Sequence, residues 1–491
     1  MGLVATDWSF NELSVQAVLA VMSIGNSISL LAFGWLADRY GRALVMRNLL
    51  LLTIAAAIFM QGSRSLELTL WGRFLVGLSS GGLMAAMLPL LAELLPAKSR
   101  GFYLTVWTCG RPAGALFAVI ISCLLPRMQW TNFIFLLTLP AVVLYILCRL
   151  EVVPESPRFL YLVGRREEGY FTLLDIYDKE MTCLPWAPES VSLTSSPESK
   201  EVKAGLEKLH SSDATITAFL CLIVFMINCL GADDHAGDLQ YAGEPTGFNR
   251  VPICPGVVQS PQVHSLALLQ SPPDHHSVMV VAQGYMLELC GIVLCATVSS
   301  AAGSRRRSDG PTVEETSPGA DGKGTKEMWP AKHLDSPGYQ VLSRRWLIRG
   351  ALLCAAVLSF ATTAAEGRRM WFSAGPLYGA VLIAQSAAFN FLLVYTCEKF
   401  PTSSRASAVG LVLFFGEVAR FFMPALGIVL LRHMSQFTVV SIFNSLYLVA
   451  FVLTFQLPLP SFREKPLHDI DESRGKDALK RKRLGVTYQT V

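Results

Sequence analysis

The sequence predicts an all-α membrane protein that crosses the bilayer many times and is built from two similar helix bundles. Three observations predict it: an apolar composition, recurring apolar runs and an internal repeat. Hydrophobic residues make up 52% of the 491 residues, charged residues only 16%, and the mean hydropathy is +0.43. Soluble domains carry about 25% charged residues. The composition therefore excludes a soluble enzyme, a disordered chain and a nucleic-acid-binding protein.

The apolar runs are long enough to cross a bilayer as helices. A helix rises about 1.5 Å per residue, so about 20 apolar residues span the hydrocarbon core. Helices are expected because lipid offers no partner to free backbone N–H and C=O groups. We therefore expect about 11 transmembrane helices, over residues 14–37, 44–62, 68–94, 102–125, 131–150, 214–231, 278–302, 347–364, 372–396, 405–431 and 438–457.

Positive charge predicts the orientation of these helices. If residues 1–13 face outside, most lysine and arginine residues fall in segments on the inside, as the positive-inside rule requires. Segments rich in polar residues then divide the chain. We expect an N-terminal bundle (1–150), an inner linker with short helices (151–213), a C-terminal bundle (214–460) with an outer loop (232–277) and a disordered inner loop (303–346), and a basic inner tail (461–491).

An internal repeat supports two related bundles. The segment Ala92–Arg100 returns as Cys397–Arg405, with Glu, Pro and Arg at the same three positions. Each copy joins two long apolar runs on the inside face. Duplicated bundles of this kind are typical of secondary transporters, which bind substrate near the bilayer midplane between the halves.

The first inner loop, Gly34–Arg42, reads GWLADRYGR. It joins two helices by a tight turn, where Gly34 and Gly41 permit close approach. Asp38 can accept hydrogen bonds from helix N-termini, and Arg39 and Arg42 can hold carboxylates or lipid phosphate.

Several motifs resemble those of the major facilitator superfamily. The G-x-x-x-D-R-x-G-R loop is similar to its signature, and Pro154–Leu160 is similar to the PESPR-W/F-L element of its sugar-porter and organic-ion branches. The repeated E-x-x-P-x-x-x-R segments and Tyr285–Gly291 match further elements. The combination most resembles the organic cation/anion transporter and synaptic-vesicle-protein-related group. This resemblance implies the major facilitator fold of two pseudo-symmetric helix bundles.

The sequence departs from the family pattern in two places. The signature loop follows the second helix in the family, whereas one apolar run precedes Asp38 here. We therefore expect the counterpart of helix one to be missing, through truncation or degeneration. The second copy of the loop motif is eroded at Ser300–Arg306, where Ser300 stands in place of the acidic residue.

The resemblance also implies a cytoplasmic gate of acidic and basic residues that pair when the protein faces outward. The residues that match are Asp38, Arg39, Arg42, Glu93, Arg100, Glu155, Arg158, Glu398 and Arg405. An alternative interpretation is that these residues only set topology and cap helices.

Charged residues inside the apolar runs are expected to face a cavity or a partner. An ionised side chain at the bilayer centre costs about 2.5–3.5 kcal/mol on insertion scales. Arg111 and Glu288 both lie near the middle of their runs, and the corresponding family helices are neighbours across the two halves, so we expect them to pair. Glu417 and Arg420 are three residues apart on one helix and can neutralise each other.

The favoured function is secondary-active transport of a small organic solute, an organic ion or sugar-like molecule, by alternating access. Candidate residues of the substrate cavity are Arg73, Gly77, Arg111, Asn228, Glu288, Tyr378, Gln385 and Asn390. The expected partners are the solute, the lipid bilayer and, if transport is coupled, a proton; no nucleic acid, cofactor or metal is expected, and no enzymatic constellation is found. The alternative is a degenerate, non-transporting scaffold or receptor. Whether the host is the plasma membrane or an intracellular vesicle stays open.

Overall fold

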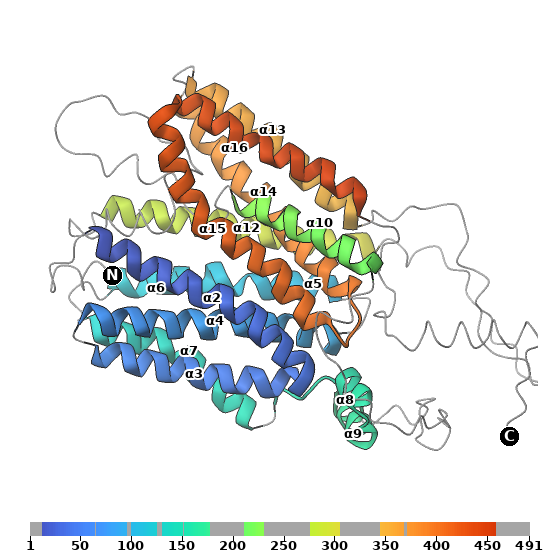
Figure 1. Ribbon diagram of the computed structural model, residues 1–491. Coiled ribbons are helices and arrows are strands. Elements are labelled where there is room, and N and C mark those ends of the chain that lie inside the picture. Colours follow the sequence, from blue (N-terminus) through green and yellow to red (C-terminus); the bar gives the residue numbers. More distant parts are fainter. Residues whose placement is uncertain are drawn as a thin grey trace, which may run out of the picture.

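The computed structural model describes residues 12–63, 65–95, 100–124, 130–150, 152–176, 211–229, 275–304, 344–367 and 371–457. These residues form helices and short connections, as the sequence predicts (Figure 1). The helices are α2 (Glu12–Tyr40), α3 (Arg42–Gly62), α4 (Leu66–Leu94), α5 (Arg100–Thr108), α6 (Gly110–Leu124), α7 (Trp130–Arg149), α8 (Pro157–Val163), α9 (Arg166–Ile176), α10 (Ser211–Asn228), α12 (His275–Ser304), α13 (Arg344–Gly367), α14 (Trp371–Lys399), α15 (Arg405–His433), α16 (Gln436–Leu453) and the 3₁₀ turn η3 (Thr454–Gln456).

Each predicted apolar run falls on a helix, and α5 and α6 share one run. Among the described residues, eight helical segments are long and apolar enough to cross a membrane, and α10 and α12 contain shorter apolar stretches, Thr215–Asn228 and Gly284–Val298. The count of 11 crossings stays a prediction. Most of the inner loop 303–346, the tail 461–491 and most of the outer loop 232–277 lie outside the described residues, whereas residues 303–304 belong to α12 and 344–346 to α13.

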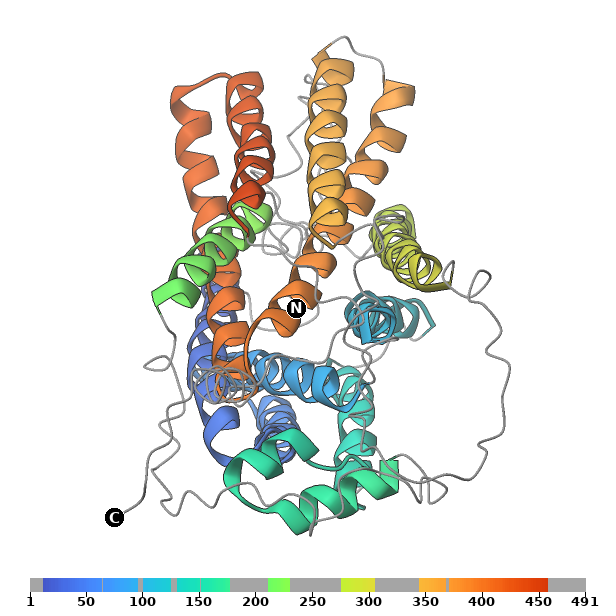
Figure 2. The same ribbon diagram turned by 90° about the vertical axis from the view of Figure 1, so that its right-hand side faces the viewer.

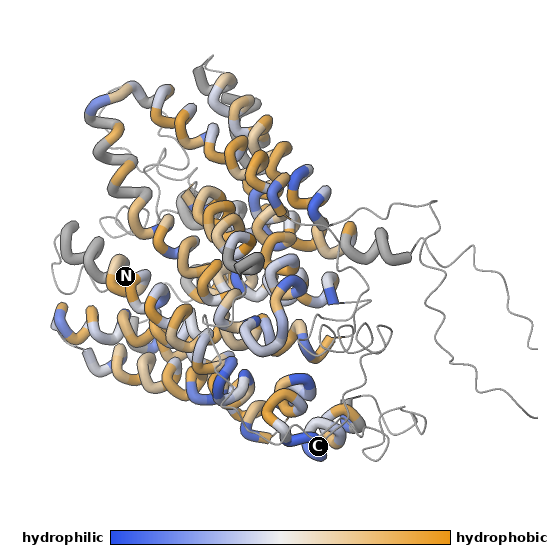
Figure 3. Tube along the Cα trace, turned by 45° about the vertical axis from the view of Figure 1, so that its right-hand side comes forward, coloured by the Kyte–Doolittle hydropathy of each residue, from blue (hydrophilic) through white to orange (hydrophobic). Residues whose placement is uncertain are grey.

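The distribution of side chains is that of a protein immersed in lipid. Large apolar side chains such as Ile58, Trp71 and Phe422 are mostly exposed, whereas the guanidinium groups of Arg42 and Arg405 are fully buried. Hydrophobic residues follow the helices along most of their length (Figure 3). In water this arrangement would be costly, but a hydrocarbon surround favours exposed apolar groups and buried charge.

Helices from the two halves of the chain meet along two seams. One seam is formed by α2 and α15, and the other by α12 with α5 and α6. Within the first half α4 packs on α2 and α3, and within the second half α13 packs on α14 and α16. Figures 1 and 2 show the helices of the first half lying together, with α15 beginning beside α2 and with α13 and α16 standing farther away. The predicted domain boundaries stay a prediction.

The predicted continuous helix over 102–125 is broken in its middle. It consists of α5 and α6, which are separated at Cys109. Pro112 explains the break, because it has no N–H to donate to the carbonyl four residues earlier and its ring disfavours that helical geometry. Gly110 adds backbone freedom at the same place. Arg111 therefore lies at the start of α6, beside the break.

Glycines bring helices into backbone contact both within the first half of the chain and between the two halves. Within the first half, a side chain at Gly25 of α2 would lie 2.5 Å from the Phe74 carbonyl oxygen, and one at Gly77 of α4 would collide with the Met22 carbonyl oxygen. Across the halves, a side chain at Gly34 would lie 2.8 Å from the Ala406 carbonyl oxygen, and one at Gly410 would collide with the Leu30 carbonyl oxygen. Small residues at such positions allow membrane helices to pack closely.

We expect Gly77→Ala to destabilise the protein by about 1–3 kcal/mol, the usual cost of overpacking, because the added methyl group would meet the backbone of α2. Thermal unfolding in detergent micelles measures this as a lower melting temperature. Gly350→Ala is the matched control, since nothing lies within 4 Å of the position that its methyl group would take. Equal melting temperatures for Gly77→Ala and the wild type would contradict the close contact.

Candidate functional site

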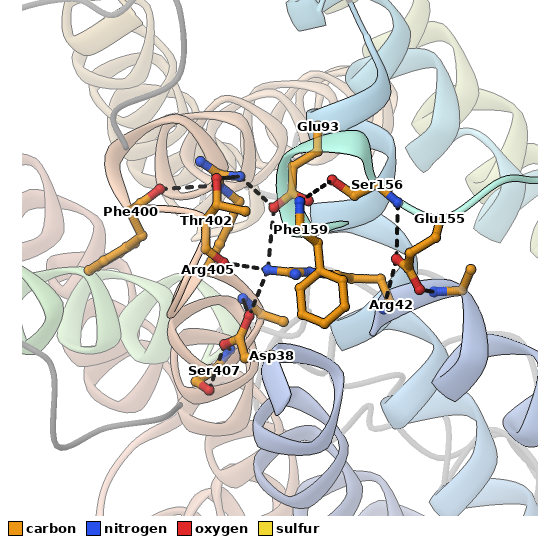
Figure 4. Close-up of polar contacts among 12 residues, drawn as sticks. Asp38, Arg42, Glu93, Glu155, Ser156, Phe159, Phe400, Thr402, Arg405 and Ser407 are labelled. Carbon is orange, nitrogen blue, oxygen red and sulfur yellow. Dashed lines mark hydrogen bonds and ion pairs between the residues drawn. The ribbon is translucent and has the colours of Figure 1, made fainter. Parts of the chain in front are cut away.

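Four charged side chains meet at one end of the α2–α15 seam. Asp38 comes from the end of α2, Arg42 from the start of α3, Glu93 from the end of α4 and Arg405 from the start of α15. We call these four residues the inner cluster (Figure 4). Asp38 is 1% exposed, and Arg42 and Arg405 are 0% exposed. Two acids and two bases balance each other, which a buried ionic group requires.

Asp38 links the two halves by capping a helix. Its carboxylate accepts hydrogen bonds from the backbone N–H groups of Ala406 (3.2 Å) and Ser407 (2.8 Å), and from the Ser407 hydroxyl (2.8 Å). These N–H groups open α15, whose own N-cap residue Ser404 makes no side-chain cap. The free N–H groups and the helix dipole both favour a negative charge there.

Arg42 joins three elements through one guanidinium group. Its Nη2 donates to Asp38 Oδ1 at 3.0 Å and to the Thr402 carbonyl oxygen, and lies 3.4 Å from Glu93 Oε1. The guanidinium carbon lies 4.5 Å from the centre of the Phe159 ring. A cation over an aromatic face is attracted to it. Arg42 thereby ties α2, α4 and the segment before α15 together.

Glu93 and Arg405 pair one copy of the repeated segment with the other. Arg405 Nη1 lies 2.5 Å from Glu93 Oε1 and 3.1 Å from Thr402 Oγ1, and Arg405 Nε donates to the Phe400 carbonyl oxygen at 3.1 Å. The acid of the first copy therefore binds the arginine of the second. The recurrence of these residues in the sequence is explained by a contact between the halves.

Glu155 explains why the turn between α2 and α3 contains a glycine. Its carboxylate accepts from the backbone N–H groups of Arg42 (3.1 Å), Ala43 (3.0 Å) and Ser156 (3.0 Å). A side chain at Gly41 would lie 2.5 Å from Glu155 Oε2, and Gly41 also has a φ of 111°. Both features require glycine. Burial raises the pKa of Glu155 above its usual range, while its hydrogen bonds and the nearby Arg42 charge oppose the shift.

The other predicted gate residues differ in position. Arg100 and Glu398 are buried at the same level of the fold, at the start of α5 and the end of α14. Arg158 is half-buried in α8. Arg39 is exposed, and its guanidinium carbon lies 5.4 Å from the Trp35 ring centre and 5.6 Å from that of Tyr40. Arg39 therefore stacks on aromatic side chains outside the inner cluster.

The predicted pairing of Arg111 with Glu288 is confirmed. Arg111 Nη2 contacts Glu288 Oε1 across the seam between α6 and α12. The Glu288 side chain is 4% exposed, whereas that of Arg111 is 44% exposed. The predicted self-pairing of Glu417 and Arg420 is also confirmed, with 2.7 Å between Oε1 and Nη2. Each of these four charges inside an apolar helix thus meets an opposite charge.

Three predicted cavity residues make contacts within the protein. Gln385 bridges helices: its Nε2 donates to the Ile227 carbonyl oxygen at 3.1 Å, and its Oε1 accepts from the Tyr447 hydroxyl at 2.6 Å. Asn228 and Asn390 each donate at 2.8 Å to the backbone carbonyl four residues earlier in their own helices. All three side chains are buried. Gln385 therefore joins α10, α14 and α16, whereas the two asparagines satisfy their own amide groups within one helix.

The remaining predicted cavity residues, Gly77, Arg73 and Tyr378, lie in different surroundings. Gly77 lies in the backbone contact between α2 and α4, where the two helices leave no space for a side chain. Its place in a substrate cavity stays a prediction. Arg73 is half-buried, with Nη1 3.8 Å from Met22 Sδ, and it has no ion pair among the described side chains. Tyr378 belongs to α14, but its side chain lies outside the described residues.

The sequence did not predict the groups that bind Asp38 and Arg42 from outside the inner cluster. The backbone N–H groups of Ala406 and Ser407 bind Asp38, and the Thr402 carbonyl and Phe159 ring bind Arg42. The sequence offers one signal for these contacts, which is position. Ala406 and Ser407 directly follow Arg405, Thr402 lies in the repeated segment Cys397–Arg405, and Phe159 lies in the motif Pro154–Leu160. Among the described residues no group of three or more His, Cys, Asp or Glu side chains could hold a metal ion.

Comparisons with known proteins find similarity to transporters. Residues 6–231 match the family model described as sugar (and other) transporter. The 4-hydroxybenzoate transporter PcaK of Pseudomonas aeruginosa is 31% identical over 42% of this chain and 45% of its own length. Organic cation/carnitine transporter 7 of Arabidopsis thaliana is 23% identical over 92% of this chain and 85% of its own length. The chain thus spans less than half the length of PcaK.

A solved structure shows the same fold over most of the chain. The proton:xylose symporter XylE of E. coli, a major facilitator superfamily protein, superimposes with a TM-score of 0.66 at 17% identity, covering 93% of this chain and 88% of XylE. At this identity the likeness concerns the fold. Together with the apolar helices, it makes the chain an integral multi-pass membrane protein. Family model, relatives and fold all point to similarity with sugar-porter-like transporters of the major facilitator superfamily.

Proposed function

We propose that this protein transports a small organic ion across a membrane by alternating access. The observation that carries the proposal is the inner cluster, a fully buried set of ion pairs that joins the two halves at one end of their seam. The relatives found by comparison are named as transporters, not as enzymes.

The inner cluster has the properties of a gate that closes one side of the protein. Opening this side requires α15 to move away from α2, which breaks the Asp38 cap and the Glu93–Arg405 pair. Charge-assisted hydrogen bonds contribute about 1.5–3 kcal/mol each, but water that enters the opened gate can replace them. The difference between closed and open states is then a few kcal/mol, which substrate binding can overcome.

The Arg111–Glu288 pair is the second functional element that we propose. It lies in the other seam, beside the break between α5 and α6. Part of the Arg111 side chain stays exposed, so an anionic solute can compete with Glu288 for the guanidinium group. This favours an organic ion, and an anion in particular, over a neutral sugar as substrate. PcaK is named for 4-hydroxybenzoate, and the plant relative for organic cations and carnitine.

Uptake into proteoliposomes tests the proposal. The full chain is reconstituted and offered radiolabelled 4-hydroxybenzoate, carnitine and xylose, and we expect saturable uptake of at least one organic ion. Arg73→Ala should reduce that uptake about tenfold or more, as loss of one charge-assisted contact of about 1.5 kcal/mol predicts. Empty liposomes are the control. Absence of flux for every organic ion in a broad panel, with correctly folded protein, would contradict transport.

Asp38→Asn should weaken the gate, because it removes the charge that caps α15. Cys397 is a native reporter, since it is 0% exposed and lies in the last turn of α14, near Glu93 and Arg405. In a variant that retains Cys397 as its single cysteine, we expect Asp38→Asn to raise the rate of N-ethylmaleimide labelling about tenfold.

Arg165→Gln is the matched control for this experiment, because Arg165 forms an exposed pair with Glu168 outside the inner cluster. It should leave Cys397 labelling unchanged. If Asp38→Asn and Arg165→Gln label at the same rate, the inner cluster is not a gate.

Arg111 and Glu288 should depend on each other energetically. Glu288→Gln and Arg111→Gln should each lower the melting temperature and uptake, since each leaves one charge without its partner. The double neutral variant should lose less than the two single losses added together, with a coupling energy of about 0.5–3 kcal/mol. Strictly additive losses in thermal unfolding would show that the pair does not act as a unit.

A further inference from the structure

Two arginines of α13 hold the end of α16. Arg345 Nη1 donates to the Leu457 carbonyl oxygen at 2.8 Å, and Arg349 Nη2 donates to the Thr454 carbonyl oxygen at 3.1 Å. Both side chains are strongly buried, with Arg345 8% and Arg349 7% exposed. The last carbonyls of a helix carry partial negative charge and accept such donors.

These carbonyls do not balance the two positive charges. A helix end carries about half an elementary charge, whereas Arg345 and Arg349 together carry two charges and lie four residues apart on one face of α13. Among the described residues no acidic side chain forms an ion pair with either arginine, and the Nε of each is buried without a hydrogen-bond partner. The corresponding turn of the first half differs, because Glu155 lies beside Arg42 there.

The two arginines lie at the ends of two candidate membrane spans. Arg345 opens one candidate membrane span, Arg345–Ala364, and Thr454 lies near the end of another, Phe437–Gln456. Exposed aromatic side chains flank them: the Arg349 guanidinium carbon is 4.1 Å from the Phe455 ring centre and 5.1 Å from that of Trp346. Exposed tryptophan beside basic residues is typical of the level at which lipid headgroups lie.

We propose that Arg345 and Arg349 bind the phosphate of an anionic glycerophospholipid. A guanidinium group matches two phosphate oxygens with parallel hydrogen bonds. The exposed rings of Trp346 and Phe455 offer apolar surface to the acyl chains beside that phosphate. By the predicted orientation this end of α13 faces the cytoplasm, whose leaflet carries most of the anionic lipid. The site is separate from the inner cluster and does not depend on the transport activity.

Native mass spectrometry of the full chain in detergent tests this site. We expect phosphatidylserine to bind about fivefold or more tightly than phosphatidylcholine, and Arg345→Gln and Arg349→Gln each to weaken phosphatidylserine binding about fivefold, as about 1 kcal/mol per arginine implies. Arg349→Lys keeps the charge without the planar fork and should show an intermediate loss. Arg165→Gln should bind phosphatidylserine as the wild type does.

Two further experiments determine whether the anion that binds Arg345 and Arg349 is a lipid phosphate, free phosphate or an acidic side chain of the tail. Inorganic phosphate at millimolar concentration should not displace phosphatidylserine; if it does, the site takes free phosphate and the lipid proposal is overturned. The second experiment neutralises four acids of the tail, Glu464, Asp469, Asp471 and Glu472, by Glu→Gln and Asp→Asn changes. If phosphatidylserine binds only to this variant, the acids of the tail are the partners of Arg345 and Arg349 in the wild type, and the lipid proposal is overturned.

Circular dichroism and size-exclusion chromatography show whether each glutamine variant folds. The proposal can still be tested if one of them does not. In that case the wild type alone decides: equal binding of phosphatidylserine and phosphatidylcholine overturns the proposal. Its failure is distinct from failure of the transport proposal, because lipid binding is measured without solute or flux.

Discussion

An acidic side chain at the end of one helix caps another helix that lies far away in the sequence. Asp38 satisfies the first N–H groups of α15, and it is itself neutralised by Arg42. A carboxylate buried to this degree is stable only with several donors around it. The remaining members of the inner cluster follow from this requirement, since each charge that enters the buried seam needs an opposite charge there.

Much of the fold could be predicted from the sequence because lipid imposes a simple rule. Apolar runs of about 20 residues must form helices, and each predicted run does fall on one. The break at Cys109 does not follow from that rule, although Pro112 signals it, because hydropathy alone does not distinguish one long helix from two short ones. The number of helices that cross the bilayer depends on more than apolar length, as the shorter apolar stretches of α10 and α12 illustrate.

The candidate site could be predicted in its charged residues but not in its geometry. Unpaired charge is so costly in hydrocarbon that Arg111 and Glu288 had to meet, and they do. Neutral polar residues give no such signal: Gln385 joins helices, and Asn390 binds its own backbone. Glycine is ambiguous for a related reason, because Gly77 can mark either open space or close contact, and only neighbouring helices decide which.

The glycine contact between α2 and α15 places two kinds of interaction side by side in one seam. At Gly34 and Gly410 the two backbones touch. About one turn further along α2, Asp38 binds the N–H groups of Ala406 and Ser407. Because Gly34 packs on these same two residues, a bulkier side chain at position 34 would push the start of α15 away from Asp38 and weaken its cap, although the substitution would add or remove no charge.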